Sequence, residues 1–423
     1  MRDDQDVNER ISNWAGNVTF TAARLHRPST VAELRALVAG AERIHALGTG
    51  HSFSRVADSP GDLVTVAGLP PVMDVDTAAG TVTVSAGMRY GELAPYLHEK
   101  GYALHNLGSL PHLSVAGACA TGTHGSGVRN GGLATAVSEI ELVTAGGELA
   151  LLRRGDDVFD AAVVGLGAFG VATRLTLDLQ PTFDVEQYVY DDMPFATFRE
   201  HFTEVMSAAY SVSAFTDWAG PTVRDVWVKR RVDEPLPPPV EWLGAVRADG
   251  PRHPVPGMPA ENCTEQLGVP GPWHARLPHF RLEFTPSSGE ELQTEFFVAR
   301  EDAVAGLAAL DTVRDRIAPV LQICEIRTIA ADRLWLSPAY GRDSVAFHFT
   351  WVKDADAVAP VVAAIEERLA PLGARPHWGK VFGMAPEVVA ERYPRLRDAA
   401  ALAHDRDPRG VFRNDMLDRY LNF

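Results

Sequence analysis

I-H-A-L-G-T-G-H-S-F-S, residues Ile44–Ser54, is the stretch from which the rest of the chain can be interpreted. Ile44–Leu47 is a short apolar run typical of a strand, and it leads directly into G-T-G-H-S at Gly48–Ser52. Two glycines around a small polar residue let the backbone turn sharply and approach a ligand closely. The N–H groups of such a turn can cradle an anion such as a pyrophosphate. His51 would then place an imidazole beside the bound group; the alternative is a plain glycine-rich turn with a surface histidine.

The composition indicates a globular protein of more than one domain. The chain has 423 residues, which is more than one hydrophobic core usually organises. A formal net charge of −16 argues against nucleic acid or an anionic membrane as a partner, because both favour a basic surface. Cys119, Cys263 and Cys324 are scattered without C-x-x-C spacing, so we expect neither a disulfide framework nor a zinc site.

The start of the chain and its hydropathy predict a soluble protein of the cytoplasm. Met1–Arg10 is polar and acidic, with no apolar segment that would indicate a signal peptide. No apolar run approaches the length that spans a bilayer. We therefore expect no membrane association.

The first half of the chain predicts a mixed α/β unit that contains a β-hairpin. Thr30 and Glu33 fit a capping box at the start of a helix. The predicted strands and helices, given by residue number, are strands 63–66, 72–75 and 81–85, helix 90–100, strand 137–144, helix 156–164 and strand 171–179. The turn between strands 72–75 and 81–85 is short enough for a hairpin.

Two further glycine-rich stretches lead to opposite conclusions. Asn106–Gly127 is almost free of charge and rich in small residues, which favours a packed segment whose amides and hydroxyls reach a buried ligand over an ordinary helix–loop corner. Gly165–Gly170 is a literal G-x-G-x-x-G, but a predicted helix precedes it and a predicted strand follows. The nicotinamide fingerprint requires the reverse order, so we reject that site.

The character of the chain changes after Pro181, and a second domain is expected there. Long proline-rich loops at 235–239 and 250–278 precede a predicted strand (293–298), helix (301–319), two strands (321–328 and 344–352) and a helix (355–369). This order indicates an antiparallel sheet in an α+β unit. The end, Tyr393–Phe423, is predicted to be helical and then irregular.

Period-two alternation in the second domain places polar residues in pairs. Glu325 and Arg327 share one face of their predicted strand, and His348 and Thr350 share one face of the next. Such a set could grip a polyol; the alternative is an amphipathic sheet with a wet polar face. Lys380, in H-W-G-K, could stabilise an alkoxide or act as a base if desolvation lowered its pKa. No Ser/His/Asp set and no metal-ligand spacing are present.

Taken together, these motifs resemble the vanillyl-alcohol-oxidase-type flavoproteins, and within them most of all the alditol oxidases, which act on xylitol and sorbitol. The motifs that carry the resemblance are G-T-G-H-S-F, L-G-S-L-P-H-L-S-V-A-G-A-C-A-T-G-T-H-G-S-G, E-I-R, H-F-T-W and H-W-G-K, supported by N-W-A-G-N, F-T-D-W and N-C-T-E-Q. The resemblance covers nearly the whole chain, except for about the last dozen residues, whose contacts we leave unassigned.

The resemblance implies a two-domain α+β fold that binds FAD. Residues 1–181 would form the FAD-binding domain, residues 182–385 the substrate domain, and residues 386–423 a segment that returns to the FAD-binding domain. His51 would be bonded covalently to the flavin. The other residues implied at the cofactor are Ala46, Leu47, Gly48, Thr49, Gly50, Ser52, Ser109, Ser114, Val115, Ala116, Gly117, Thr121, Gly122, Thr123, His124, Gly170, Val171 and His377.

The resemblance also implies the substrate site and the reaction. Ser109, Glu325, Arg327, Thr350 and Lys380 would bind a polyol, with Arg327, Lys380 and His348 as catalytic residues. A terminal hydroxyl would be oxidised by hydride transfer to flavin N5, with oxygen reduced to peroxide. Whether Lys380 or His348 takes the hydroxyl proton stays open.

Three functions are compatible with these residues. The leading one is an alditol oxidase, which would act as a monomer on a small polyol with oxygen. The resemblance implies that the residue before the active-site serine lies near the flavin atom that reacts with oxygen; here it is Gly108, whose lack of a side chain favours an oxidase over a dehydrogenase. The alternatives are a sugar-lactone oxidase or dehydrogenase of the same flavoprotein group and a non-catalytic polyol-binding protein.

Overall fold

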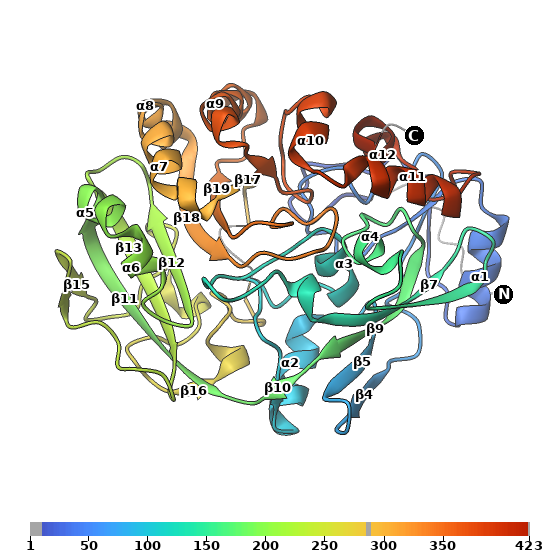
Figure 1. The fold of residues 1–423 in the computed structure, drawn as a ribbon, viewed down its shortest axis with the longest axis horizontal. Coiled ribbons are helices and arrows are strands. Elements are labelled where there is room, and N and C mark those ends of the chain that lie inside the picture. Colours follow the sequence, from blue (N-terminus) through green and yellow to red (C-terminus); the bar gives the residue numbers. More distant parts are fainter. Residues whose placement is uncertain (1–10, 285–288, 422–423) are drawn as a thin grey trace.

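Two lobes built around separate sheets make up the protein, whose structure is a computed structural model that describes residues 11–284 and 289–421 (Figure 1). The prediction for Met1–Arg10 lies outside the described residues. One lobe contains a parallel and an antiparallel sheet, and the other contains a large antiparallel sheet. The α+β class predicted from the sequence is confirmed.

A small parallel sheet carries the glycine turn. Its strands, in spatial order, are β1 (Arg24–His26), β3 (Asp62–Val64) and β2 (Ile44–Ala46). Helix α1 (Val31–Gly40) packs on it and begins where the sequence predicts, because the Thr30 side chain accepts a hydrogen bond from the Glu33 N–H. The predicted capping box is only half formed, since the Glu33 carboxylate binds Ser29 and not the Thr30 amide.

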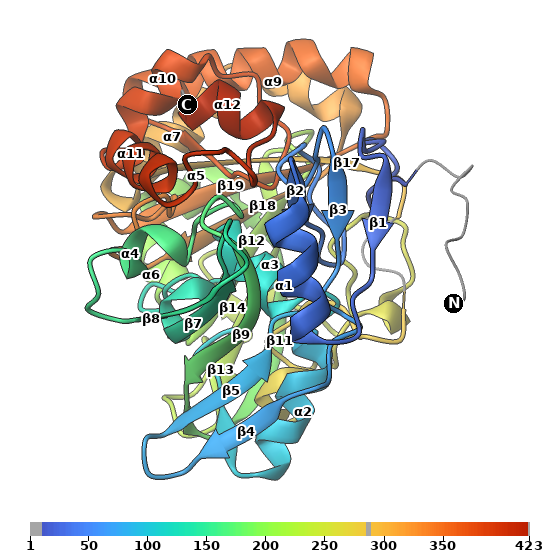
Figure 2. The ribbon, with the colours of Figure 1, turned by 90° about the vertical axis from the view of Figure 1, so that its right-hand side faces the viewer.

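The second sheet of this lobe is antiparallel, and α1 lies between the two sheets (Figure 2). Its strands, in spatial order, are β4 (Met73–Asp76), β5 (Thr81–Ser85), β9 (Val171–Asp178), β7 (Val137–Val143) and β8 (Leu149–Arg153). The hairpin of β4 and β5 is confirmed. The sequence analysis missed β8, whose outward leucines, Leu149 and Leu151, lack the polar alternation of a half-buried strand.

Short helices and a two-stranded ribbon complete this lobe. They are α2 (Tyr90–Glu99), β6 (Tyr102–Ala103), α3 (Val115–Ala120), the 3₁₀ turn Leu133–Ala136, α4 (Phe159–Ala162) and β10 (Gln180–Pro181). The helix predicted over 156–164 is therefore shorter than expected. Gly165–Gly170 joins α4 to β9, the order that excludes a nicotinamide fingerprint.

The second lobe is organised by an antiparallel sheet with ten strands among the described residues. In spatial order they are β14 (Glu241–Trp242), β15 (Ala245–Arg247), β11 (Asp184–Pro194), β13 (Thr222–Arg231), β12 (Ser211–Thr216), β18 (Leu321–Ile329), β19 (Ser344–Trp351), β17 (Leu292–Ala299) and β20 (Arg375–Pro376), with β16 (Gly271–Pro272) paired to β11. The antiparallel sheet predicted from strands 293–298, 321–328 and 344–352 is confirmed, but it is much larger than predicted.

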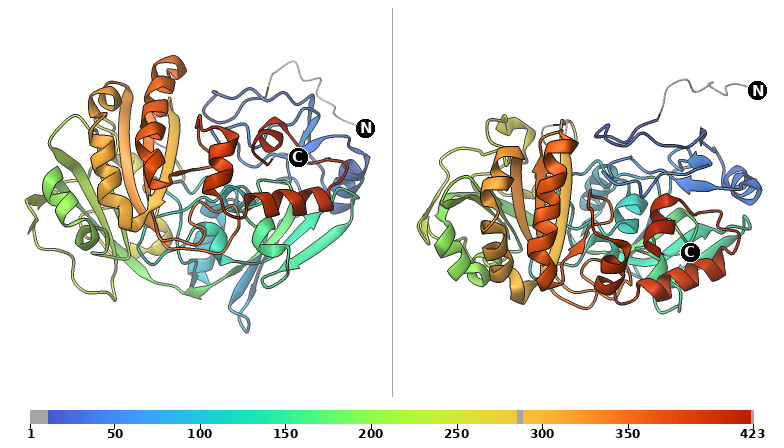
Figure 3. Two further views of the ribbon diagram at one scale, coloured as in Figure 1. Left: turned by 45° about the horizontal axis from the view of Figure 1, so that its top comes forward. Right: turned by 90° about the horizontal axis from the view of Figure 1, so that it is seen from above.

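Helices cover one face of this sheet and leave the other turned toward the first lobe (Figures 1 and 3). They are α5 (Phe195–Glu200), α6 (Phe202–Met206), α7 (Ala303–Asp311), α8 (Arg314–Ile317) and α9 (Ala355–Leu369). The single helix predicted over 301–319 is wrong. It ends at Asp311, where the Thr312 hydroxyl and amide both donate to the Ala309 carbonyl and the backbone tightens to i−3 hydrogen bonds. Helix α9 is confirmed over its whole length.

The C-terminal segment returns to the first lobe (Figure 2). It contains α10 (Pro386–Arg392), α11 (Leu396–Arg406) and α12 (Asp415–Leu421), so the predicted order of helix followed by irregular chain is wrong. The Asn414 amide donates to the carbonyls of Val56 and Asp58, and the His45 ring contacts the Phe412 carbonyl. None of the helices within the described ranges is long and apolar enough to cross a membrane.

Candidate active site

A cavity lies where the glycine turn, the Asn106–Gly127 segment and the helix-free face of the large sheet meet, and part of the 248–280 loop also lines it. Most of the residues implied by the family resemblance line it. They are Ala46, Leu47, Gly48, Thr49, Gly50, His51, Ser52, Ser109, Ser114, Ala116, Gly117, Thr121, Thr123, His124, Gly170, Glu325, Arg327, His348, Thr350, His377 and Lys380. Segments far apart in the sequence therefore form one site.

Three of the implied cofactor residues do not line the cavity. The side chains of Val115 and Val171 are buried in hydrophobic clusters, and the Val115 amide donates to the Met88 carbonyl. The Gly122 amide donates to the Cys119 carbonyl, and a Cβ at Gly122 would lie 2.9 Å from the Pro338 side chain. These three residues therefore pack behind the residues that line the cavity and do not contact its interior.

The glycine turn and the start of α3 approach each other too closely for side chains. A Cβ at Gly48 would lie 2.6 Å from the Ser114 hydroxyl oxygen, and a Cβ at Gly117 would lie 2.8 Å from the same atom. A side chain at either position would force the Ser114 hydroxyl to move, and glycine avoids this contact. The result is a bare backbone surface on one side of the cavity, as a cradle for a large cofactor requires.

His51 stands at the edge of this bare surface. Its ring stacks on Trp14, with centroids 5.4 Å apart and an interplanar angle of 16°. Burial, followed by the charges of His112 and Lys380, lowers the pKa of His51 to about 4, so the imidazole is neutral near pH 7. Its buried Nδ1 atom has no hydrogen-bond partner among the described residues. A neutral nitrogen of this kind fits a covalent or hydrogen-bonded attachment to a bound group.

The opposite wall is the polar face of the large sheet. Strand register places His348 between Glu295 and Glu325, and Thr350 beside Gln293. All of these side chains are buried. The alternative of an ordinary amphipathic sheet with a wet polar face is therefore wrong, and the charges need partners inside the protein.

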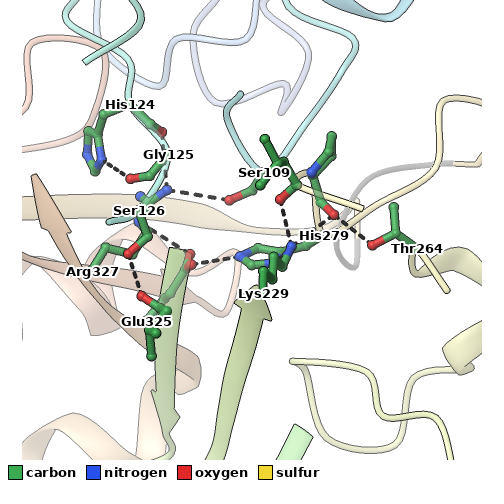
Figure 4. Close-up of polar contacts among 12 residues, drawn as sticks. Ser109, His124, Gly125, Ser126, Lys229, Thr264, His279, Glu325 and Arg327 are labelled. Carbon is green, nitrogen blue, oxygen red and sulfur yellow. Dashed lines mark hydrogen bonds and ion pairs between the residues drawn. The ribbon is translucent and has the colours of Figure 1, made fainter. Parts of the chain in front are cut away.

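Arg327 is the centre of a buried ion network (Figure 4). Its Nη2 atom lies 2.6 Å from Glu295 Oε1, and its Nε atom lies 3.6 Å from Glu325 Oε2, an ion pair too long for a hydrogen bond. Nη1 donates to the Ser109 hydroxyl and the His124 carbonyl, both at 3.4 Å. Burial opposes the charge of Arg327, but the two carboxylates raise its pKa overall. Arg327 is thus a permanent cation in the cavity wall.

A second network contains Lys380 and His348, which share an acceptor. The Gln293 side-chain oxygen accepts from the Lys380 ammonium and lies 3.1 Å from His348 Nε2, while the Gln293 amide nitrogen donates to Glu291. Burial, followed by the nearby Lys380, lowers the pKa of His348 to about 3. Burial lowers the pKa of Lys380 to about 8. At neutral pH the site therefore holds a neutral histidine and a lysine that can lose its proton.

The sequence analysis missed several cavity residues. Gln293 and Glu295 follow the same period-two alternation that identified Glu325 and Arg327, in L-Q-T-E-F-F, so this signal was present. His279, which donates to Glu325 at 2.8 Å, lies in a proline-rich loop where no periodicity exists. No cluster of His, Cys, Asp or Glu in the described ranges could hold a metal ion, and the three cysteines are buried free thiols.

Comparison with known families agrees with this geometry. Residues 22–152 match the model of an FAD binding domain, and residues 291–420 match the model of D-arabinono-1,4-lactone oxidase. The first match includes the glycine turn, and the second includes the polar strands and Lys380. The bare backbone surface and the unpartnered His51 nitrogen fit the cofactor that the first model describes.

Full-length relatives give the same result. An alditol oxidase from a Streptomyces species is 54% identical over 97% of this chain and 99% of its own length. L-gulono-1,4-lactone dehydrogenase from Mycobacterium tuberculosis is 31% identical over 97% of this chain and 98% of its own. The crystal structure of cholesterol oxidase from B. sterolicum superimposes with a TM-score of 0.79 at 16% identity, covering 97% of this chain and 96% of that chain, which shows a shared fold.

Fold and site together define an FAD-dependent oxidoreductase of the vanillyl-alcohol-oxidase type. Within that class, the chain belongs to the family of alditol oxidase and the sugar-lactone oxidoreductases, and it is more similar to alditol oxidase.

Proposed function

We propose that this protein oxidises the terminal primary hydroxyl of alditols such as xylitol and sorbitol to the aldose, and passes the electrons to oxygen to form hydrogen peroxide. The observation that carries the proposal is the buried polar set on β18 and β19, which faces the bare glycine surface across one cavity. A chain of hydroxyls needs several fixed donors and acceptors, and these strands supply them. The similarity to alditol oxidase supports the same substrate class.

FAD would lie along the glycine turn and the start of α3, with His51 as the residue of covalent attachment. When bound, FAD would supply the acceptor for the hydride of the alcohol, which carries both electrons, while the hydroxyl proton goes to a group of the protein. His377 lines the same cavity, and burial lowers its pKa to about 3, so it would contribute a neutral ring near the cofactor. A neutral lining favours an aromatic cofactor over water in this part of the cavity.

The polyol would be held by Ser109, Glu325 and Thr350 and activated between Arg327 and Lys380. Glu325 is ionised, because Arg327 and then His279 lower its pKa although burial alone would raise it. A carboxylate accepts hydrogen bonds from hydroxyls, so Glu325 and Thr350 would orient the chain of the polyol. Arg327 would stabilise negative charge on the reacting oxygen.

Lys380 is the better candidate for the group that takes the hydroxyl proton. Its pKa of about 8 is close to neutral pH, whereas the conjugate acid of His348 has a pKa of about 3 and would hold a proton poorly. In this proposal His348 stays neutral and donates through Nε2 to Gln293, which keeps its other ring nitrogen available as an acceptor for a substrate hydroxyl.

Oxygen would reach the site beside Gly108. A Cβ at this position would touch the Thr123 methyl group at 3.5 Å and the His124 carbonyl at 3.8 Å, and both residues line the cavity. The absence of a side chain at Gly108 therefore leaves space next to the cavity wall. We propose on this basis that the enzyme is an oxidase and not a dehydrogenase.

The domain division also belongs to the proposal. Residues 1–181 with the returning segment 386–423 would bind FAD, and residues 182–385 would bind the polyol. The contacts of Asn414 and Phe412 with the first lobe support the return of the C-terminal segment. We further propose a monomeric enzyme of the cytoplasm.

The test is peroxide formation by the purified, flavin-loaded protein with xylitol, sorbitol and L-gulono-1,4-lactone as separate substrates. We expect peroxide in proportion to oxygen consumed with the polyols, and a much lower kcat/KM with the lactone. A preference for the lactone would replace this proposal with the sugar-lactone alternative. Polyol binding without turnover by the loaded protein would support the non-catalytic alternative.

A further inference from the structure

A buried lysine lies next to the polar site without lining it. Lys229, on β13, is 1% exposed, and its Nζ atom donates to the carbonyls of Leu277 at 2.6 Å and Pro278 at 3.1 Å and to His279 Nδ1 at 3.1 Å. The Glu325 carboxylate can only accept from His279 Nε2, so Nδ1 of a neutral ring is an acceptor and Lys229 has three acceptors around it. Only the ammonium form supplies three hydrogens, and because burial lowers the pKa of Lys229 to about 7, these acceptors are what favours that form at neutral pH. The geometry therefore assigns a cation to a position that the catalytic proposal above does not use.

His279 connects this cation to the site (Figure 4). Because Nδ1 accepts from Lys229, the ring hydrogen is on Nε2, which donates to Glu325 Oε1 at 2.8 Å. The ring plane is fixed by edge contacts with Phe215 and Trp227, at centroid distances of 5.5 and 5.2 Å. Burial, followed by the Lys229 charge, lowers the pKa of His279 to about 4 and keeps the ring neutral.

The same segment also holds the backbone of Ser109. The amides of His279 and Phe280 donate to the Ser109 carbonyl, at 3.1 and 3.3 Å. The Ser109 hydroxyl in turn accepts from Arg327. Lys229, by binding the carbonyls of Leu277 and Pro278, thus anchors a segment that touches two of the proposed substrate residues.

We propose that Lys229 and His279 are positioning residues of the polyol site: the Lys229 ammonium fixes the tautomer of His279, and His279 holds Glu325 in the orientation that binds the substrate hydroxyls. This inference rests on the proposed function. It predicts that Lys229 affects substrate binding through Glu325, although the ammonium itself does not line the cavity.

A double-mutant cycle tests the route of the effect. With the flavin-loaded enzyme and xylitol, we expect Lys229→Met to raise KM by about tenfold, the order expected for a hydrogen bond to a charged group, and to change kcat by less than about threefold. In the Glu325→Gln background, Lys229→Met should raise KM by less than about twofold. An equal effect in both backgrounds would show that Lys229 only supports the fold, and would overturn the proposal.

A second pair of variants covers the case in which Lys229→Met does not fold. His279→Gln can donate to Glu325 and accept from Lys229, whereas His279→Leu can do neither. We expect His279→Leu to raise KM for xylitol, and His279→Gln to have a KM much closer to that of the parent. Equal KM values for the two would contradict the inference, because the two bonds would then have no role.

The pH dependence of KM provides a readout that a purely structural role would not change. The charged groups that act on His279 are Lys229, Glu325 and Arg327. Lys229→Met removes the charge but not the burial, so the pKa of His279 should rise above about 4 and stay below 6.5, and KM of Lys229→Met should gain a pH dependence within that range. Adding His279→Gln to Lys229→Met should remove it. A flat profile in Lys229→Met would count against the assigned tautomer.

The control is Lys100→Met, at an exposed lysine whose ammonium lies 5.6 Å from the centre of the Tyr96 ring. Its KM and kcat should equal those of the parent.

The proposed function and the positioning role of Lys229 and His279 can be contradicted separately. A parent enzyme without polyol-dependent peroxide formation would contradict the proposed function. An active parent with Lys229→Met and His279→Leu variants of unchanged KM would contradict only the positioning role.

Discussion

His348 Nε2 lies 3.1 Å from Gln293 Oε1, and this bond determines which ring nitrogen of His348 carries a hydrogen. The Gln293 oxygen also accepts from Lys380, and its amide nitrogen donates to Glu291, so the amide cannot be reversed without losing these bonds. His348 is therefore a donor through Nε2 and an acceptor through Nδ1. Two of the three proposed catalytic residues thus share one neutral amide group.

The rate should depend on the protonation of Lys380. Because burial lowers the pKa of Lys380 to about 8, the amine form needed for a base is absent at low pH and accumulates above about pH 8. We expect kcat/KM for xylitol to rise with pH to a plateau above about 8. Lys380→Met should lose activity by at least about a hundredfold and show no such rise. A rate that falls as pH increases through 8 would instead assign Lys380 the role of an obligatory cation.

Glu295 should be important for stability as well as for the site. Its carboxylate pairs with Arg327 at 2.6 Å and His124 at 3.1 Å, all of them buried. Glu295→Gln keeps the size of the side chain but removes one of the two carboxylates that balance the buried Arg327 charge. We expect the free energy of unfolding to fall by about 3 kcal/mol. Denaturant titration measures this loss. The matched control, Glu367→Gln at an exposed position, should change stability by less than about 0.5 kcal/mol; an equal effect of the two variants would contradict the prediction.

Local patterns in the sequence predicted the polar wall because side-chain direction on a strand is a local property. Glu325 and Arg327 point to one face in any extended backbone, and so do His348 and Thr350. Which strands are neighbours is not local. The alternation that marks Glu295 was visible in the sequence, but its place opposite His348 depends on the order of strands in the large sheet, and so does the place of Lys229 beside the site; the sequence analysis missed both residues.

The glycine turn was predictable for a related reason. A side chain at Gly48 or Gly117 would meet the Ser114 hydroxyl, and the glycines that avoid this contact are directly visible in the sequence. The position of His279 leaves no such trace, because irregular loops have no period from which to infer direction. The break in the helix predicted over 301–319 falls at Thr312, where the hydroxyl and the amide bind the same carbonyl, and nothing in the residue pattern marks this position.

Gly108 should control oxygen and not the polyol. A methyl group at this position makes ordinary contacts, the shortest at 3.5 Å, so Gly108→Ala should fold normally. We expect the rate of reoxidation by oxygen to fall by about tenfold or more, while the rate of anaerobic flavin reduction by xylitol changes less than about threefold. Stopped-flow absorbance measures the two half-reactions separately. Gly40→Ala, where a Cβ meets no atom within 4 Å, is the control. Equal changes in both half-reactions would mean that Gly108 is only a packing position.

Buried neutral histidines should make the protein sensitive to mild acid. The pKa of His279 is lowered to about 4, and the pKa values of His348 and His377 to about 3, in each case first by burial. Between these values and 6.5 the unfolded chain binds protons that the folded protein does not, so the free energy of unfolding falls as pH decreases. We expect Tm from calorimetry to drop between about pH 6.5 and 5, and less steeply in His377→Gln. A Tm that is constant over this range would contradict the neutral state of these rings.

The proposed attachment of FAD through His51 can be tested independently of turnover. His51 is neutral, stacks on Trp14 and has a buried Nδ1 atom without a partner among the described residues, so it is prepared to form a bond to the cofactor. We expect acid-precipitated parent protein to give a yellow pellet, and peptide mapping to recover flavin on the peptide that contains His51. His51→Ala should give a colourless pellet with the flavin in the supernatant.

The same variant tests what the bond does. We expect the reduction potential of flavin bound to His51→Ala to be lower than in the parent, because the covalent link withdraws electron density from the ring. His404→Ala, at an exposed histidine on α11, should match the parent in both pellet colour and potential. Flavin that stays in the His51→Ala pellet would place the attachment at another residue, and an unchanged potential would leave the bond with a role in retention alone.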